Sequence, residues 1–253
     1  MSHDDEFYVG YAPHPPPGLK RILVRVVLGL NAVAALLSVL LVFGQQRFAA
    51  SAFEFQQYRD FQGILEEAPY PALLVRRPGA AEGIFPFSRY LLVAVGKHGA
   101  SQLVSGLDGR KLRLRGSLIY RNGDTMIELA PGSVPTPEDG GAIAAGATDL
   151  GAVTLSGEIV DSKCYFGVMN PGNGKVHRDC AVRCISGGIP PAFIVKDAAG
   201  QTKTLLLAGA DGRQLDNEVL DFVAEPLTIS GQLTKSGETY ILRAEPGSFV
   251  RQE

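Results

Sequence analysis

One pattern of short apolar segments occurs twice in the 253-residue chain, and this repetition constrains the fold more than any other feature. Residues 112–116 (LRLRG) return as residues 227–231 (LTISG), which is an offset of 115 positions. Residues 131–133 (PGS) return at the same offset as residues 246–248. Short matches that recur in the same order indicate a tandem duplication.

Two further matches lie earlier in each half, and their offsets differ. Gly63 corresponds to Gly157 at an offset of 94, whereas residues 71–75 (PALLV) correspond to residues 191–195 (PAFIV) at an offset of 120. The second copy therefore carries about 26 additional residues between these two matches. The first copy has only residues 66–70 (EEAPY) at the equivalent place.

The repeated segments have the pattern of β-strands. Leu112, Leu114 and Leu118 alternate with polar residues, as expected for a strand with one face in water, and Asn122-Gly123 is a typical hairpin turn. The chain is long enough for two domains. We predict a mainly β protein with two tandem small β-barrel (OB-like) domains, while an immunoglobulin-type sandwich is the competing fold. The predicted segments are a first domain over 61–134, a linker over 135–151 and a second domain over 152–253.

An uncharged apolar run precedes the repeats. Residues 26–43 are 18 consecutive residues without a charge, which is long enough for a helix that crosses a bilayer. Lys20, Arg21 and Arg25 precede the run and only Arg47 follows it closely. Because basic residues stay in the cytoplasm, the predicted orientation has a cytoplasmic N-terminus and periplasmic C-terminal domains.

The run thus predicts a single-pass protein of the bacterial inner (plasma) membrane, with a transmembrane helix over residues 21–44. A cytoplasmic tail over 1–20 and a stalk over 45–60 complete this organisation, and residues 51–60 are expected to form a short helix in that stalk. A cleaved signal peptide, with a small-residue site at 50–52, and a buried core helix are the alternatives.

The additional residues of the second copy, 164–190, contain all three cysteines of the protein. A short helix is predicted over residues 177–185, where His177, Cys180 and Cys184 share one face, and Cys164 ends the preceding strand. Three thiolates and an imidazole suit Zn²⁺, while Cu(I) or an iron–sulfur cluster would also accept sulfur ligands. Cys164, His177, Cys180 and Cys184 are therefore the predicted metal ligands.

Two other interpretations of these cysteines remain open. Outside the cytoplasm, Cys164 can form a disulfide with Cys180 or Cys184, and the thiols can also pack as small apolar side chains. Asp161 is a candidate for orienting the histidine, although a strand-end Asp more often accepts bonds from turn amides. The chain has no Cys-x-x-Cys-His motif, so covalent haem attachment is not expected.

The segment GEIVDSKCYFGVMNPGNGKVHRDCAVRCISGGIPP resembles one found in exported or membrane-anchored bacterial proteins that are largely uncharacterised. The shared pattern is a Cys after a strand, then His-x-x-Cys-Ala-x-x-Cys and an exit through Gly-Gly-Ile-Pro-Pro. The resemblance covers about 40 residues of the second domain. It implies that these residues form one unit, and it implies no activity.

Together these features predict a protein without a catalytic constellation of its own. A net charge of −2 excludes the basic field of a nucleic-acid-binding protein, and no small-molecule substrate is identified. The predicted function is an accessory subunit of a membrane-bound electron-transfer complex, with other subunits of that complex as partners. A thiol–disulfide or metal-delivery protein and a structural subunit with a disulfide staple are the alternatives. Because the domains are tandem copies, loss of Cys164 is expected to destabilise the second domain and to spare the first.

Overall fold

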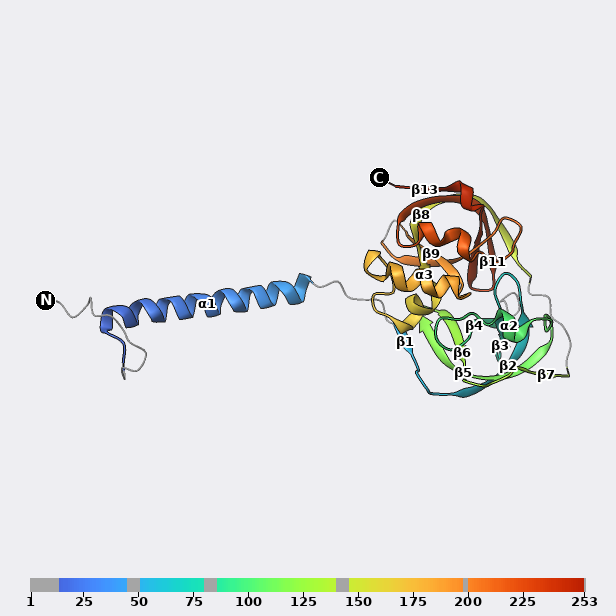
Figure 1. Cartoon of the computed structure of the whole chain (residues 1–253), viewed down its shortest axis with the longest axis horizontal. Coiled ribbons are helices and arrows are strands. Elements are labelled where there is room, and N and C mark those ends of the chain that lie inside the picture. The colour runs from blue at the N-terminus through green and yellow to red at the C-terminus, as the bar shows by residue number, and fades with distance from the viewer. Residues whose placement is uncertain (1–13, 45–50, 80–85, 140–145, 198–199, 253) are drawn as a thin grey trace. The chain divides into compact units, whose positions relative to one another are not determined.

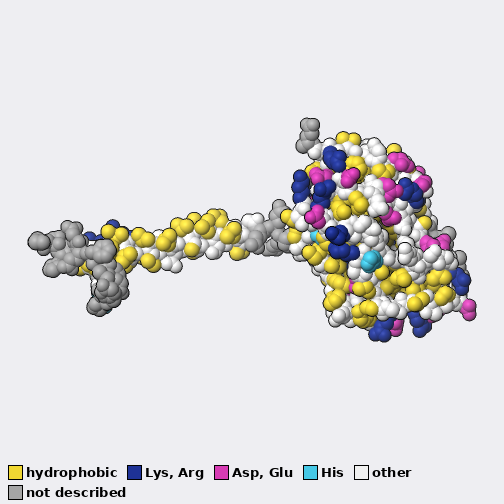
Figure 2. Space-filling view, viewed as in Figure 1, with side chains coloured by type: hydrophobic (Ala, Val, Ile, Leu, Met, Phe, Trp, Pro, Cys, Tyr) yellow, Lys and Arg dark blue, Asp and Glu magenta, His cyan; other side chains and the backbone are white. Residues whose placement is uncertain are grey.

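The computed structural model describes residues 14–44, 51–79, 86–139, 146–197 and 200–252, and the chain divides into a helical unit and a β unit (Figure 1). The helical unit is α1 (Pro17–Gly44), which begins four residues before the predicted span and ends at the same residue. None of its side chains is buried, and apolar side chains cover it along its length (Figure 2). The helix is long and apolar enough to cross a membrane.

The β unit contains two closed five-stranded barrels, which confirms the predicted fold class. In the first barrel, β2 pairs with β3 and β5, β3 pairs with β4, and the parallel pair β4 and β6 is closed by β5. This strand order is that of an OB-like barrel. The strands are β2 (Arg59–Glu66), β3 (Ala72–Arg76), β4 (Phe87–Val93), β5 (Lys111–Arg121) and β6 (Asp124–Leu129).

The second barrel repeats every one of these pairings, including the parallel pair, which is β10 with β12. Its strands are β8 (Thr148–Asp161), β9 (Pro191–Lys196), β10 (Thr202–Ala208), β11 (Pro226–Ser236) and β12 (Thr239–Arg243). The shorter elements of the unit are β1 (Ser51–Phe53), α2 (Ser101–Val104), β7 (Thr136–Glu138), η4 (Asn217–Phe222), η5 (Pro246–Ser248) and β13 (Phe249–Arg251).

Two predicted connecting segments belong to the barrels instead. Residues 51–60, expected as part of a helical stalk, contain β1 and the start of β2, because both strands pair with the long strand β5. The predicted linker 135–151 contains β7, which also pairs with β5, and the start of β8. Pairing with β5 and β11 provides partners for backbone groups that a linker would leave in water. Residues 45–50 and 140–145 lie outside the described part of the chain.

The glycines that mark the repeat lie where two strands approach too closely for a side chain. A Cβ atom on Gly63 would lie 2.5 Å from the carbonyl oxygen of Leu74, and one on Gly157 would lie 2.2 Å from that of Ile194. Both glycines are in the first long strand of their barrel and face the second. The repeated glycine is therefore a requirement of barrel packing rather than of a turn.

This close approach predicts that Gly157→Ala destabilises the protein by about 1–3 kcal/mol, because the new methyl group forces β8 away from β9. Urea unfolding of the detergent-solubilised chain measures the change. Gly146→Ala is the matched control, since nothing lies within 4 Å of the position of its Cβ atom. A Gly157→Ala protein as stable as the control would contradict the proposed packing.

The two barrels share a hydrophobic core in addition to the core inside each barrel. One cluster joins Leu91, Val93 and Met126 of the first barrel to Leu206 and Ile241 of the second. Both copies therefore form one folded unit. A substitution that destabilises the second domain is therefore expected to destabilise the first domain as well, and not to spare it.

The loop between the first two strands of each barrel docks on the other barrel. In the first barrel this loop carries Tyr70, whose buried hydroxyl group donates to the carbonyl oxygen of Leu207 at 2.7 Å and accepts from the N–H of Leu215 at 2.9 Å. In the second barrel it is the cysteine-containing segment, in which Gly167 approaches the carbonyl group of Ala52 in β1. The two loops fasten the barrels to each other.

Candidate metal centre

The cysteine-containing segment leaves the second barrel after β8 and returns to it at β9. It contains a π-helical turn, η2 (Cys164–Val168), a 3-10 turn, η3 (Lys175–His177), and the helix α3 (Arg178–Ser186). The helix agrees within one residue with the prediction, and Gly187 follows its last turn. Cys164 does not end the strand as expected, because β8 stops at Asp161 and Cys164 begins η2.

Three thiols meet between η2 and α3. The Sγ atom of Cys164 lies 4.0 Å from those of both Cys180 and Cys184, and the three sulfur atoms lie within 4.8 Å of one another. All three cysteines are free, and the Sγ–Sγ distances from Cys164 are about twice the 2.05 Å of a disulfide bond. Cys164 and Cys184 are buried, and Cys180 is partly exposed.

The separation of the sulfur atoms fits ligands of a single metal ion. Thiolates bound at about 2.3 Å stand about 3.8 Å apart around a tetrahedral ion and about 4.0 Å apart around a trigonal one. Cys164 meets this requirement with both of the other cysteines. The cluster of cysteine and histidine side chains in this segment could therefore bind a metal.

His177, the fourth predicted ligand, belongs to an adjoining group. Its Nε2 atom lies 2.9 Å from Oδ2 of Asp161, while Oδ1 of Asp161 accepts the backbone N–H of Cys164 at 2.8 Å. The ligand atoms of Asp161, Cys164 and His177 lie within 4.8 Å of one another. Asp161 therefore fulfils both roles considered for it, and Cys164 is the residue shared by the two groups.

Lys97 is part of the site although sequence reasoning did not select it. This residue follows β4 of the first barrel, and its Nζ atom lies 2.8 Å from Sγ of Cys180 and 3.5 Å from Sγ of Cys184. Its carbonyl oxygen is too near Gly187 for any side chain there, since a Cβ atom would lie 1.8 Å away. The loop of one barrel thus abuts the helix of the other.

His98, which is next to Lys97 in the sequence, does not join the thiols. Its side chain is exposed and lines a groove of about 880 Å³ between the barrels. No spacing rule distinguishes Lys97 from His98, because 83 positions separate Lys97 from Cys180. Only the barrel packing brings this lysine to the thiols.

The charges around the thiols favour unequal protonation. The hydrogen bond to Cys184, burial and the carboxylate of Asp161 raise the pKa of the Cys164 thiol. The hydrogen bond from Cys164 and the nearby ammonium group of Lys97 lower the pKa of Cys184. Contact with Cys180 raises the pKa of Lys97, which therefore stays a cation. A metal that binds all three sulfurs must displace the proton of Cys164.

The loop that carries Lys97 is held by a second lysine. The Nζ atom of Lys163 donates to the carbonyl oxygens of Ala94 at 2.9 Å and Gly96 at 2.6 Å, and it forms an ion pair with Glu128. The side chains of both members of this pair are almost entirely buried, with 4% of Lys163 and 10% of Glu128 exposed. Lys163, directly before Cys164, thus fixes the first barrel against the thiol cluster.

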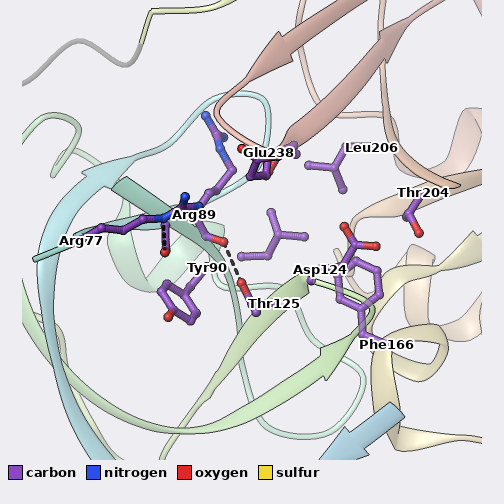
Figure 3. Close-up of a pocket in the computed structure, with 13 residues that line it drawn as sticks. Arg77, Arg89, Tyr90, Asp124, Thr125, Phe166, Thr204, Leu206 and Glu238 are labelled. Atoms are coloured by element: carbon purple, nitrogen blue, oxygen red, sulfur yellow. Dashed lines mark hydrogen bonds between the residues drawn. The ribbon is translucent and has the colours of Figure 1, made fainter. Parts of the chain in front are cut away.

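A small polar cavity of about 100 Å³ lies elsewhere between the barrels (Figure 3). It is lined by Arg89 and Asp124 of the first barrel and by Thr204 of the second. Burial raises the pKa of Asp124 to about 6, against the smaller opposing effects of Thr204 and Lys203. The folded protein therefore holds a proton on this carboxyl group more tightly than the unfolded chain does.

This raised pKa predicts a contribution to stability that falls as the pH rises from about 4 to about 6 and is constant above that. Asparagine cannot ionise, so Asp124→Asn avoids the stability that is lost when the carboxyl group ionises. We expect the substitution to stabilise the protein by about 1–2 kcal/mol at pH ~7.5, allowing for partial solvent screening, and by little at pH ~4. Urea unfolding at the two pH values measures the difference. An equal effect of the substitution at both pH values would contradict the prediction.

Comparison with protein-family models, with curated proteins and with solved structures finds no match to this chain.

Proposed function

We propose that this chain is a membrane-anchored, extracytoplasmic and non-catalytic subunit that holds one soft metal ion in its second barrel. The observation that carries the proposal is the convergence of Cys164, Cys180 and Cys184 within 4.8 Å of one another. Buried thiols in such an arrangement are suited to Cu(I) or Zn²⁺. An iron–sulfur cluster is less well supported, because its thiolate ligands must also reach more than one iron atom.

The surroundings of the thiols support a closed centre rather than a catalytic one. Cys164 and Cys184 are buried, His177 is engaged with Asp161, and the ammonium group of Lys97 covers Cys180. A catalytic metal site keeps a coordination position open for water or substrate. A closed, sulfur-rich centre that holds copper instead suits electron transfer, and α1 would keep it near the membrane-bound subunits that exchange electrons with it. Zinc has no redox chemistry, so a zinc-loaded centre would have a structural role.

Metal analysis of the detergent-solubilised, full-length protein tests the proposal. The reduced protein is loaded without oxygen with Cu(I), with Zn²⁺, or with iron and sulfide, and unbound metal is then removed. We expect one equivalent of Cu(I) or Zn²⁺ per chain, with loss of the three titratable thiols. A metal-free protein that retains all three reactive thiols after each treatment would disprove the metal site. A reversible one-electron wave of the copper form, measured by voltammetry, would support electron transfer.

Metal delivery is a second candidate, favoured by the partial exposure of Cys180. A ligand at the surface allows an incoming thiol to begin an exchange that fully buried ligands would prevent. Transfer of the bound metal to a dithiol chelator distinguishes the two functions. Release within seconds would indicate delivery, whereas release over hours would indicate a permanent centre.

A further inference from the structure

The contact between Lys97 and Cys180 joins the two barrels at a distance shorter than an ordinary hydrogen bond to sulfur. Their Nζ and Sγ atoms are 2.8 Å apart. That distance is normal for an oxygen acceptor, but the larger radius of sulfur places an N–H···S pair at about 3.3 Å. Both side chains are partly exposed, so that small oxidants in solution can reach them.

We propose that Lys97 and Cys180 form an oxidative crosslink in which one oxygen atom bridges Nζ and Sγ. A bridging oxygen needs the two atoms nearly as close as they already are, so that its formation requires almost no movement of either barrel. Cys184, whose Sγ atom is 3.5 Å from the same nitrogen, is the less favoured partner. The oxidant is dioxygen, or a peroxide derived from it.

The reaction balances with dioxygen alone. Lys97 reacts as the neutral amine, which its ammonium group yields by releasing a proton to solvent. The thiol then loses its S–H hydrogen and the amine loses one N–H hydrogen, while S–O and O–N bonds form to one oxygen atom of O₂. The second oxygen atom leaves as water with these two hydrogens. Sulfur and nitrogen each lose two electrons, and the four electrons reduce both oxygen atoms. Two equivalents of a dithiol reverse the reaction and restore the thiol and the amine.

The competing oxidation is a disulfide between Cys164 and Cys180. Their sulfur atoms are 4.0 Å apart and must approach by about 2 Å before they can bond. The disulfide stays within the second barrel, whereas the oxygen bridge ties the loop after β4 in the first barrel to α3. Either product withdraws Cys180 from metal binding. The crosslink itself needs only a free thiol and amine, so it does not depend on the proposed metal centre.

Mass spectrometry of the full-length protein in detergent tests the crosslink. The protein is reduced, stripped of metal with a chelator and then exposed to air or to hydrogen peroxide. We expect a gain of about 14 Da, one oxygen added and two hydrogens lost, that dithiothreitol reverses. Because a modified Lys97 resists trypsin, the digest should contain residues 90–110 joined to residues 179–183.

Two variants make the result specific. Lys97→Arg keeps the positive charge but should abolish the gain of about 14 Da, whereas Cys164→Ser should retain it. A loss of about 2 Da alone would show that a disulfide forms instead and would overturn the proposal. An unchanged mass, or a gain of about 14 Da that persists in Lys97→Arg, would overturn it as well. None of these outcomes depends on whether the reduced protein binds a metal.

Discussion

Cys164→Ser is expected to lower the affinity for Cu(I) or Zn²⁺ by at least about 100-fold, the largest effect of any single change at the thiol cluster. Cys164 is the residue common to the three-thiol group and to the group formed with Asp161 and His177. A serine hydroxyl is a poor ligand for a soft metal ion, and the two remaining thiols do not complete a site. Competition with a chromophoric chelator, under oxygen-free conditions, measures the affinity.

The matched control is His98→Ala, which removes an exposed side chain in the loop that carries Lys97. It should leave the metal affinity unchanged. His177→Asn should have an intermediate effect, about 10- to 100-fold, if the histidine acts through Asp161 and not as a direct ligand. Stoichiometric, tight metal binding by Cys164→Ser would refute the three-thiol centre. Because Cys164 lies in the shared core, the variant should also destabilise both barrels together.

Lys163→Met is expected to destabilise the protein by about 3–5 kcal/mol, the largest stability effect that we predict. The substitution leaves the carboxylate of Glu128 buried without its cation, and it leaves the carbonyl oxygens of Ala94 and Gly96 without their donor. Methionine retains the length of the apolar stem, so that the loss is due mainly to the charge. Urea unfolding of the detergent-solubilised protein gives the change.

The double variant Lys163→Met with Glu128→Leu separates the destabilisation caused by an unpaired buried charge from the net stabilisation that the ion pair provides. Replacing both charges should recover a large part of the lost stability, since a buried ion pair contributes little net stabilisation over apolar neighbours. A surface pair provides the comparison: Lys235→Met removes a partner of the exposed Glu238 and should cost less than about 1 kcal/mol. If Lys163→Met costs no more than this, the pair does not fasten the barrels.

Much of the fold could be predicted because the duplication repeats local requirements. The glycines at positions 63 and 157 are where strands approach closely, and the alternation of leucines in β5 gives the buried face of the barrel. The change of offset between the copies correctly located the inserted segment. The helix in this segment could be predicted because turn-forming residues precede and follow it, and these are local sequence signals. The expected helix in residues 51–60 was wrong, because pairing with β5 outweighs local propensity there.

The contacts that join the two barrels could not be predicted from the sequence. Lys97, Lys163 and Tyr70 are single residues of common types, and each meets a partner in the other copy. Such contacts depend on how the two barrels pack, and neither periodicity nor spacing encodes that packing. Of the four predicted ligands, the three cysteines come together, whereas His177 is hydrogen-bonded to Asp161.

The reciprocal docking of the two loops also bears on how a duplicated gene can diverge. Tyr70 in one copy and the cysteine-containing segment in the other each pack against the opposite barrel. Once both existed, neither copy could be lost, exchanged or transplanted alone without exposing Leu91 and Met126 or their counterparts Leu206 and Ile241 to water. What began as two equivalent modules has become a pair of unequal, mutually dependent halves.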